Sequence, residues 1–266
     1  MQDLNITFIQ SDLSWQNHQA NIRSFQEKIN QIEKPTDLII LPEMFNTGFV
    51  VKPQDIDPLA AQESLLFLQK IAQEKQTVIT ASMIVKENDN YYNRLYWVLP
   101  DGSFKSYNKK HLFSLGNEHL RFTAGEETLI VELKGWKIKP LICYDLRFPV
   151  WAKNNYHSGN YDYDLLIYVA NWPAARAYAW RSLLTARAIE NQSYAIGVNR
   201  IGKDDHGTPH SGFSGVIEPK GEWISKEAED IESMQSITLS AKDLIDYREK
   251  FTVGLDWDEF KVISKG

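Results

Sequence analysis

Short apolar runs alternate along the chain with longer segments in which apolar residues recur at helical spacing. Runs rich in β-branched residues and bounded by polar or turn residues predict strands at 4–10, 37–42, 77–85, 137–143, 164–171 and 193–199. Helical patterns lie between these runs, at 17–33, 59–74 and 175–191. Strands that alternate with helices indicate an α/β protein.

Two further stretches have the pattern of β-hairpins. Residues 91–109 contain two strand-like runs joined around Asp101-Gly102, and residues 214–226 repeat this arrangement around Lys220-Gly221. Because hairpins join antiparallel strands, they predict mixed sheets, and two such sheets packed face to face with helices outside would satisfy the pattern. Gly and Pro are scattered and no internal repeat is visible, so we predict a single domain over residues 1–266.

Composition narrows the class of protein. The formal net charge of −6 argues against binding to nucleic acid backbones, which normally requires a basic face. The first residues lack the basic start and apolar run of a signal peptide, and no apolar run approaches the roughly 18 residues of a membrane helix. The single cysteine excludes an intrachain disulfide. These features predict a soluble cytoplasmic protein that binds neither nucleic acid nor membranes.

Glu43 and Cys143 each follow directly on a run that predicts a buried strand. Ligands gather beyond the carboxyl ends of strands in open α/β sheets, so the two side chains can converge on one pocket. Taken singly, a lone cysteine often behaves as a small buried hydrophobe, and Glu43 can be a paired structural carboxylate. A Cys–His pair through His111 or His119 is also open, although no spacing favours it.

No motif predicts a metal ion or a cofactor. The six histidines show no pair at the spacing that zinc sites use, and one cysteine cannot form a thiolate cluster. No glycine-rich dinucleotide fingerprint follows the first strand.

Three short motifs become informative when they are considered in order. LPEMFNTGF carries Glu43, YNKKHLF carries Lys109, and LICYDLRFP carries Cys143. Together they resemble the nitrilase superfamily, the carbon–nitrogen hydrolases built on a Glu-Lys-Cys triad. The resemblance extends over 171–200, 213–222 and 247–260, and these details are most similar to the omega-amidase branch, bacterial enzymes that deaminate 2-oxoglutaramate and related 2-oxo-acid amides.

The resemblance implies a four-layer α-β-β-α sandwich, a homodimer that associates through a helix like the one at 175–191, and no cofactor. The family pattern Lys-x-His-Leu assigns the catalytic role to Lys109 rather than Lys110, and Glu118 fills the place of a second family glutamate. One departure concerns substrate specificity, because this branch often has a histidine where Ala179 stands.

The implied mechanism begins with removal of the thiol proton of Cys143 by Glu43. The thiolate attacks the amide carbonyl, and Lys109 with the backbone N–H after Cys143 stabilises the oxyanion. Glu43 then protonates the leaving ammonia, and water hydrolyses the thioester. We therefore predict an omega-amidase that converts 2-oxoglutaramate or 2-oxosuccinamate to the 2-oxo acid. The alternatives are hydrolysis of an N-carbamoyl amino acid, another short amide or a nitrile, and a catalytically silent binding scaffold.

Several residues are candidates for substrate binding. Arg147 and Arg176 suit the distal carboxylate, because a guanidinium pairs with a carboxylate at two points. Arg147 can instead brace its loop through Asp145 or Glu190. The remaining candidates are Tyr144, Trp172 and Phe45, of which Trp172 and Phe45 can also be plain core aromatics.

Overall fold

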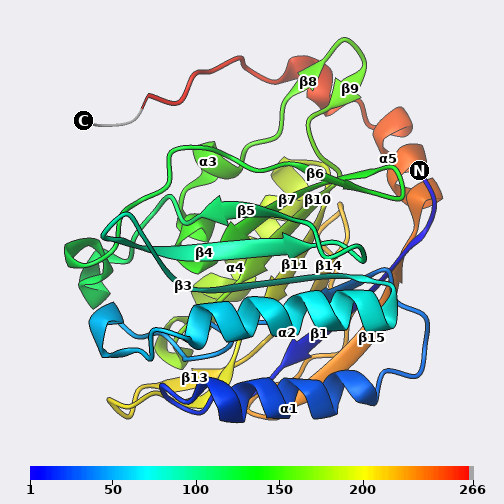
Figure 1. Ribbon diagram of the computed structural model, residues 1–266. Helices are drawn as coiled ribbons and strands as arrows, with labels where there is room; N and C mark the ends of the chain where they lie inside the picture. Colours follow the sequence, from blue (N-terminus) through cyan, green and yellow to red (C-terminus); the bar gives the residue numbers. More distant parts are fainter. Residues whose placement is uncertain (264–266) are drawn as a thin grey trace.

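The structure, a computed structural model that describes residues 1–263, contains two large mixed β-sheets flanked by helices (Figure 1). The strands of the first sheet lie in the order β15 (Ser233–Leu239), β1 (Leu4–Gln10), β2 (Leu38–Ile40), β3 (Val78–Glu87), β4 (Asn90–Val98) and β5 (Phe104–Asn108). Those of the second lie in the order β14 (Gly215–Ile217), β11 (Tyr194–Val198), β10 (Leu165–Val169), β7 (Trp136–Ile142) and β6 (Val131–Leu133).

Helices cover the outer faces of the two sheets. The first sheet is covered by α1 (His18–Asn30) and α2 (Ala60–Lys75), which lie side by side in Figure 1. The second is covered by α4 (Ala177–Glu190) and the short α3 (Pro149–Ala152), and α5 (Ala241–Lys250) follows β15. Two small hairpins complete the strands: β8 (Tyr156–His157) with β9 (Asn160–Tyr161), and β12 (Ile201–Lys203) with β13 (Pro209–Ser211).

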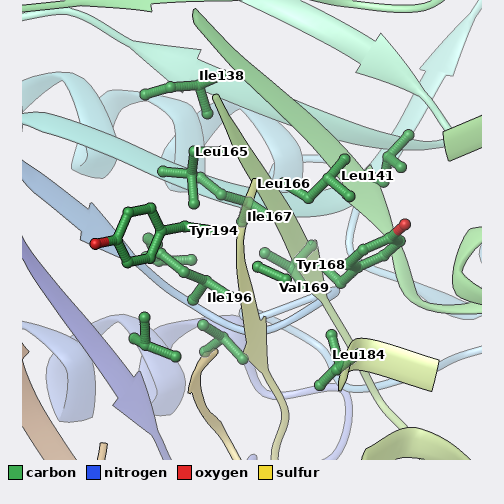
Figure 2. Packing of buried hydrophobic residues seen from close by; sticks show 14 of the residues in the cluster. Ile138, Leu141, Leu165, Leu166, Ile167, Tyr168, Val169, Leu184, Tyr194 and Ile196 are labelled. Carbon is green, nitrogen blue, oxygen red and sulfur yellow. The ribbon is translucent and has the colours of Figure 1, made fainter. Parts of the chain in front are cut away.

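Alternation along the strands explains why the layers form. In β1, Ile6 and Phe8 pack between the two sheets, whereas Ile9 packs against α1 and α2. The central strand β10 is buried on both faces, as Figure 2 shows for Leu165 to Val169 among residues of β7, β11 and α4. The predicted arrangement of two mixed sheets with helices outside is therefore confirmed.

Parallel pairing aligns the strand ends that carry the polar residues. In the first sheet Phe8, Ile40 and Thr80 are in register, so β1 and β2 end close together, whereas β3 continues beyond them to Glu87. In the second sheet Ile142, Val169 and Val198 are in register. The segment that follows β2 therefore leaves the first sheet beside the end of β1, and the segments that follow β7 and β10 leave the second sheet side by side.

The structure bears out most predicted elements within a few residues and corrects others. The hairpin around Asp101-Gly102 joins β4 to β5. The arm after Lys220-Gly221 makes only an isolated bridge, between Ile217 and Trp223, because the Ser225 hydroxyl takes the Val216 N–H that a second strand would pair. The sequence patterns missed β15 and α5, and the strand predicted to reach Cys143 ends at Ile142.

None of the helices within residues 1–263 is long and apolar enough to cross a lipid bilayer.

Candidate active site

Cys143 occupies a sharp turn between a strand and a one-turn helix. Strand β7 ends at Ile142, and the 3₁₀ segment η4 (Cys143–Arg147) begins at once. Cys143 has a φ of 44°, in the left-handed region that non-glycine residues seldom adopt. Such conformations cost free energy and cluster at functional sites, where the surrounding structure holds them. The turn sets the side chain at the wall of a cavity.

Three charged side chains lie together beside this turn. The Nζ atom of Lys109 is 2.8 Å from Glu43 Oε1 and 3.0 Å from Glu118 Oε2. All three side chains are at most 1% exposed. Burial of charges is tolerated only when they are paired and hydrogen-bonded, and here two carboxylates share one ammonium. The structure thus brings together Glu43, Lys109, Glu118 and Cys143, which come from four separate segments of the chain.

Two asparagines that the sequence analysis did not single out complete the cluster. Asn93, on β4, donates its Nδ2–H to Glu43 Oε1 at 2.8 Å and to Glu118 Oε1 at 3.2 Å. Asn171 follows β10, and its backbone N–H donates to Glu43 Oε2 at 2.8 Å. Its position after a buried strand is the signal that pointed to Glu43 and Cys143, so the same rule could have found it.

Burial and charge set the protonation states of the cluster. Burial raises the pKa of the Cys143 thiol well above its ordinary value, the negative charge of Glu43 raises it further, and Lys109 opposes both. Burial alone would lower the pKa of Lys109, but the carboxylates of Glu118 and Glu43 outweigh it and the pKa is raised. Burial also raises the pKa of Glu118 against the influence of Lys109. The resting site therefore holds a protonated thiol beside a charged lysine.

Asp145 joins the cysteine turn to the segment that carries Lys109. Its Oδ2 accepts hydrogen bonds from the Ile142 N–H at 3.0 Å and the Tyr107 hydroxyl at 2.8 Å. Its Oδ1 accepts from the His111 N–H at 3.0 Å and lies 2.8 Å from Nδ1 of the same histidine. Residues 107 and 111 flank Lys109 on either side, so one buried carboxylate ties both catalytic segments together.

A cavity of about 330 Å³ opens beside Cys143 and Lys109. Among the predicted substrate-binding residues, Tyr144, Arg147, Trp172 and Arg176 line it. Phe45 does not line it, because its ring is buried between Phe25 and Phe67 under the first sheet, with centroid distances of 5.7 and 6.2 Å.

Both arginines at the cavity lie against aromatic rings. The guanidinium carbon of Arg147 is 4.9 Å from the centre of the Trp172 ring, and that of Arg176 is 5.4 Å from the Phe113 ring. The alternative that Arg147 braces its loop is wrong, because Glu190 pairs with Arg187, and Asp145 is occupied by Ile142, Tyr107 and His111. Each guanidinium therefore lies beside one aromatic ring, and its fork of N–H donors is of the kind that pairs with a carboxylate.

The other side of the cavity is formed by residues that no sequence pattern indicated. Phe49 and Phe113 contribute rings, and the hairpin of β12 and β13 contributes further polar side chains, namely Asp204, His206, Thr208 and His210. The pKa of His210 is lowered to about 4, chiefly by burial and then by the positive charge of Arg200. Within residues 1–263 no group of three or more His, Cys, Asp and Glu side chains could hold a metal ion.

The two-sheet fold and a buried Glu-Lys-Cys cluster at the ends of its strands are the features of hydrolases that cleave carbon–nitrogen bonds. The sequence profile of the carbon-nitrogen hydrolase family matches residues 5–249, and the chain belongs to this family.

Among curated relatives, the omega-amidase YafV of Escherichia coli K12 is 42% identical over 98% of this chain and 100% of its own length. The 2-oxoglutaramate amidase of Bacillus subtilis is 32% identical over 93% of this chain and 95% of its own length. A crystal structure of a CN-hydrolase superfamily protein from Xanthomonas campestris, with an arsenic adduct in its active site, aligns with a TM-score of 0.92 at 38% identity, covering 98% of this chain and 100% of that one.

Proposed function

We propose that the protein is an omega-amidase that hydrolyses the terminal amide of 2-oxo dicarboxylic acid monoamides, such as 2-oxoglutaramate and 2-oxosuccinamate, to the 2-oxo acid and ammonia. One observation carries this proposal: Cys143 lines a cavity beside the buried Glu43–Lys109 pair and two arginines. The similarity over nearly the full chain to an omega-amidase and a 2-oxoglutaramate amidase supports the choice of substrate.

The first half of the reaction forms a thioester. Because the resting thiol is protonated, Glu43 takes its proton as the sulfur attacks the amide carbonyl carbon. The oxygen of the tetrahedral intermediate carries negative charge beside Lys109 and the N–H of Tyr144, which lies in the first turn of η4 and has no partner within that turn. The C–N bond then breaks, and Glu43 returns the proton to the leaving nitrogen as ammonia.

The second half regenerates the enzyme. A water molecule gives a proton to Glu43 and attacks the thioester carbon, and the same donors stabilise the second oxyanion. The C–S bond breaks, the acid product forms, and Glu43 returns its proton to the sulfur. Glu118 remains paired with Lys109 through both halves and keeps the ammonium in place.

The far end of the substrate requires a carboxylate anchor. Arg147 and Arg176 supply two positive charges at the cavity wall, and Trp172 fixes the local chain by donating its indole N–H to the Arg176 carbonyl at 2.8 Å. We expect Arg147→Ala and Arg176→Ala to raise KM for carboxylated amides by roughly tenfold or more, because each removes a charged hydrogen-bond partner. A neutral short amide serves as the control, and an equal loss with that control would contradict an anchoring role.

The direct test is release of ammonia from 2-oxoglutaramate by the purified protein, with Cys143→Ala as the blank. Succinamate, glutamine, an N-carbamoyl amino acid and a simple nitrile are assayed in parallel. We expect fast release from 2-oxoglutaramate that disappears in the variant. Release only from another compound would keep the thiol chemistry but reject the substrate, and turnover by Cys143→Ala would reject the nucleophile.

We also propose that the protein is a cytoplasmic homodimer. Leu184 and Ala188 of α4 are buried in the core of their own chain and Leu183 is partly buried against it, whereas Tyr178 is 84% and Ile189 is 47% exposed. These exposed apolar side chains support pairing through this helix. Sedimentation at micromolar concentration tests it, since a monomer would contradict the proposal. The free thiol of Cys143 supports the cytoplasm as the location, because cysteines stay reduced in that compartment.

A further inference from the structure

Asn93 contacts all three charged residues of the cluster. Its side-chain amide donates to Glu43 and to Glu118, and its backbone carbonyl accepts the Lys109 N–H at 2.9 Å. The residue is fully buried within β4, a strand whose following positions are mostly apolar. The backbone contacts would be made by any residue at this position, but the side-chain contacts require a donor with two hydrogens.

The hydrogen bonds of Glu43 distinguish its two oxygens. Oε1 accepts from Lys109 Nζ and from Asn93 Nδ2, both at 2.8 Å, whereas Oε2 accepts from the Asn171 N–H and, within residues 1–263, from no other N–H group. A carboxylate oxygen has two lone-pair sites, so Oε1 is filled and Oε2 keeps one open. The Asn171 carbonyl lies 4.0 Å from the Cys143 sulfur, so the residue that binds Oε2 also contacts the thiol.

We infer that Oε2 is the oxygen of Glu43 that accepts the Cys143 proton, and that Asn93 is the positioning residue that makes it so. By filling Oε1 together with Lys109, the amide of Asn93 prevents the carboxylate from rotating its other oxygen toward the sulfur. Its second hydrogen holds Glu118 on the far side of Lys109. This inference rests on the proposed function, because it assigns the base of that reaction atom by atom.

The orientation of the amide follows from its partners. Carboxylate oxygens only accept hydrogen bonds, so the NH₂ group of Asn93 must face them. Its Oδ1 then points away and, within residues 1–263, has no hydrogen-bond partner although it is buried. A buried acceptor without a partner is unfavourable for the fold. Its presence here is expected if the side chain serves the two carboxylates rather than the stability of the sheet.

Asn93→Leu tests the assignment, because leucine has a similar size and no donor. The charged groups that face Glu43 are Lys109, Glu118 and Cys143 when ionised, with His210 further away. Loss of the amide removes a donor from each carboxylate and so weakens their ionised forms. Both carboxylates then take up protons at higher pH, and the acid limb of the pH–rate profile moves to higher pH.

Thr80→Val is the matched control. Thr80 is equally buried, lies on neighbouring β3, and donates its hydroxyl to the Tyr96 carbonyl at 2.9 Å, but it does not contact the cluster. With 2-oxoglutaramate we expect Asn93→Leu to lower kcat at least roughly tenfold with KM within about threefold. Thr80→Val should leave kcat and the position of the acid limb unchanged. Asn93→Ser, which keeps one hydrogen-bond donor, should have a kcat between those of wild type and Asn93→Leu.

A measurement without substrate keeps this inference separate from the proposed function. Carboxyl ¹³C spectra of glutamate-labelled protein, assigned with Glu43→Gln and Glu118→Gln, report the two buried carboxylates directly. We expect both signals to move at higher pH in Asn93→Leu than in wild type or Thr80→Val. Signals that titrate as in wild type would overturn the inference even if the enzyme is active. A wild type that releases no ammonia from 2-oxoglutaramate, with these signals shifted, would reject the substrate and retain the role of Asn93.

Discussion

At Cys143 two charged neighbours act in opposite directions. The carboxylate of Glu43 raises the pKa of the thiol, adding to the effect of burial, and Lys109 lowers it. The lysine therefore does not keep the cysteine deprotonated in the resting enzyme. It provides fixed positive charge where the oxyanion develops, and the proton leaves the sulfur only as Glu43 receives it.

Glu43→Gln separates these two effects. Removal of the negative charge should lower the pKa of the Cys143 thiol, because the carboxylate raises that pKa in the native site. Turnover should nevertheless fall by several orders of magnitude, since no group remains to protonate the leaving ammonia. The ultraviolet absorbance of the thiolate as a function of pH, with Cys143→Ala subtracted, measures the first effect. An unchanged or higher thiol pKa would show that Glu43 does not act on the sulfur electrostatically.

The residues of the site differ in how far a sequence can indicate them. Glu43 and Cys143 follow apolar strands and stand out by position. Lys109 does not stand out, because Lys109-Lys110 looks like a pair of solvent-exposed lysines in a loop. Only the resemblance to the family pattern distinguished Lys109 from Lys110. Phe45 was mistaken for a wall of the cavity because the loop after β2 turns through Met44 at a φ of 43° and Gly48 at 74°. Alternation does not hold in such a loop, so the direction of a side chain cannot be inferred from it.

At the level of elements, the site depends on two segments held at a fixed separation. The end of β5 carries Tyr107 and leads to Lys109, and the end of β7 leads to Cys143. Asp145 accepts hydrogen bonds from both segments, so one carboxylate links the segment that carries the ammonium to the segment that carries the nucleophile. The sequence could predict both strands from their apolar pattern. It could not predict that they meet, because β5 and β7 belong to different sheets and their approach depends on how the two sheets pack face to face.

Asp145→Asn should loosen this connection. Asparagine keeps the shape of the side chain but replaces one accepting oxygen with an NH₂ group. That group would face the N–H or O–H donors that bind Asp145, and these donors would lose their acceptor. We expect roughly 3 kcal/mol lower stability and a kcat reduced by more than tenfold, because both Lys109 and Cys143 shift. Chemical denaturation and steady-state kinetics measure the two effects. Asp101→Asn, in the exposed turn after β4, is the control, and a normal kcat in Asp145→Asn would mean that the connection does not matter for catalysis.

At the scale of the whole molecule, the packing of two sheets forms the site and also buries a histidine that makes the stability of the fold depend on acid. Segments after strands of both sheets converge on the cavity, and the β12–β13 hairpin closes one side with a buried histidine. Nδ1 of His210 is 3.0 Å from the Thr208 carbonyl, which can only accept, so this nitrogen carries the hydrogen. Burial and the positive charge of Arg200 lower the pKa of His210 and so favour the neutral imidazole in the folded protein, although this hydrogen bond acts in the opposite direction.

His210 should contribute to unfolding at low pH. Its pKa is lowered from 6.5 to about 4 in the folded protein, mainly by burial. Between these values the unfolded chain binds a proton that the folded chain does not, so stability is lost as the pH falls through this window. His210→Gln removes that difference, which amounts to at most roughly 3 kcal/mol. Its Tm should therefore decline less than that of wild type between pH 6.5 and pH 4. His157→Gln, at an exposed position, should follow wild type, and the same acid dependence in His210→Gln would show that the carboxylates alone govern acid unfolding.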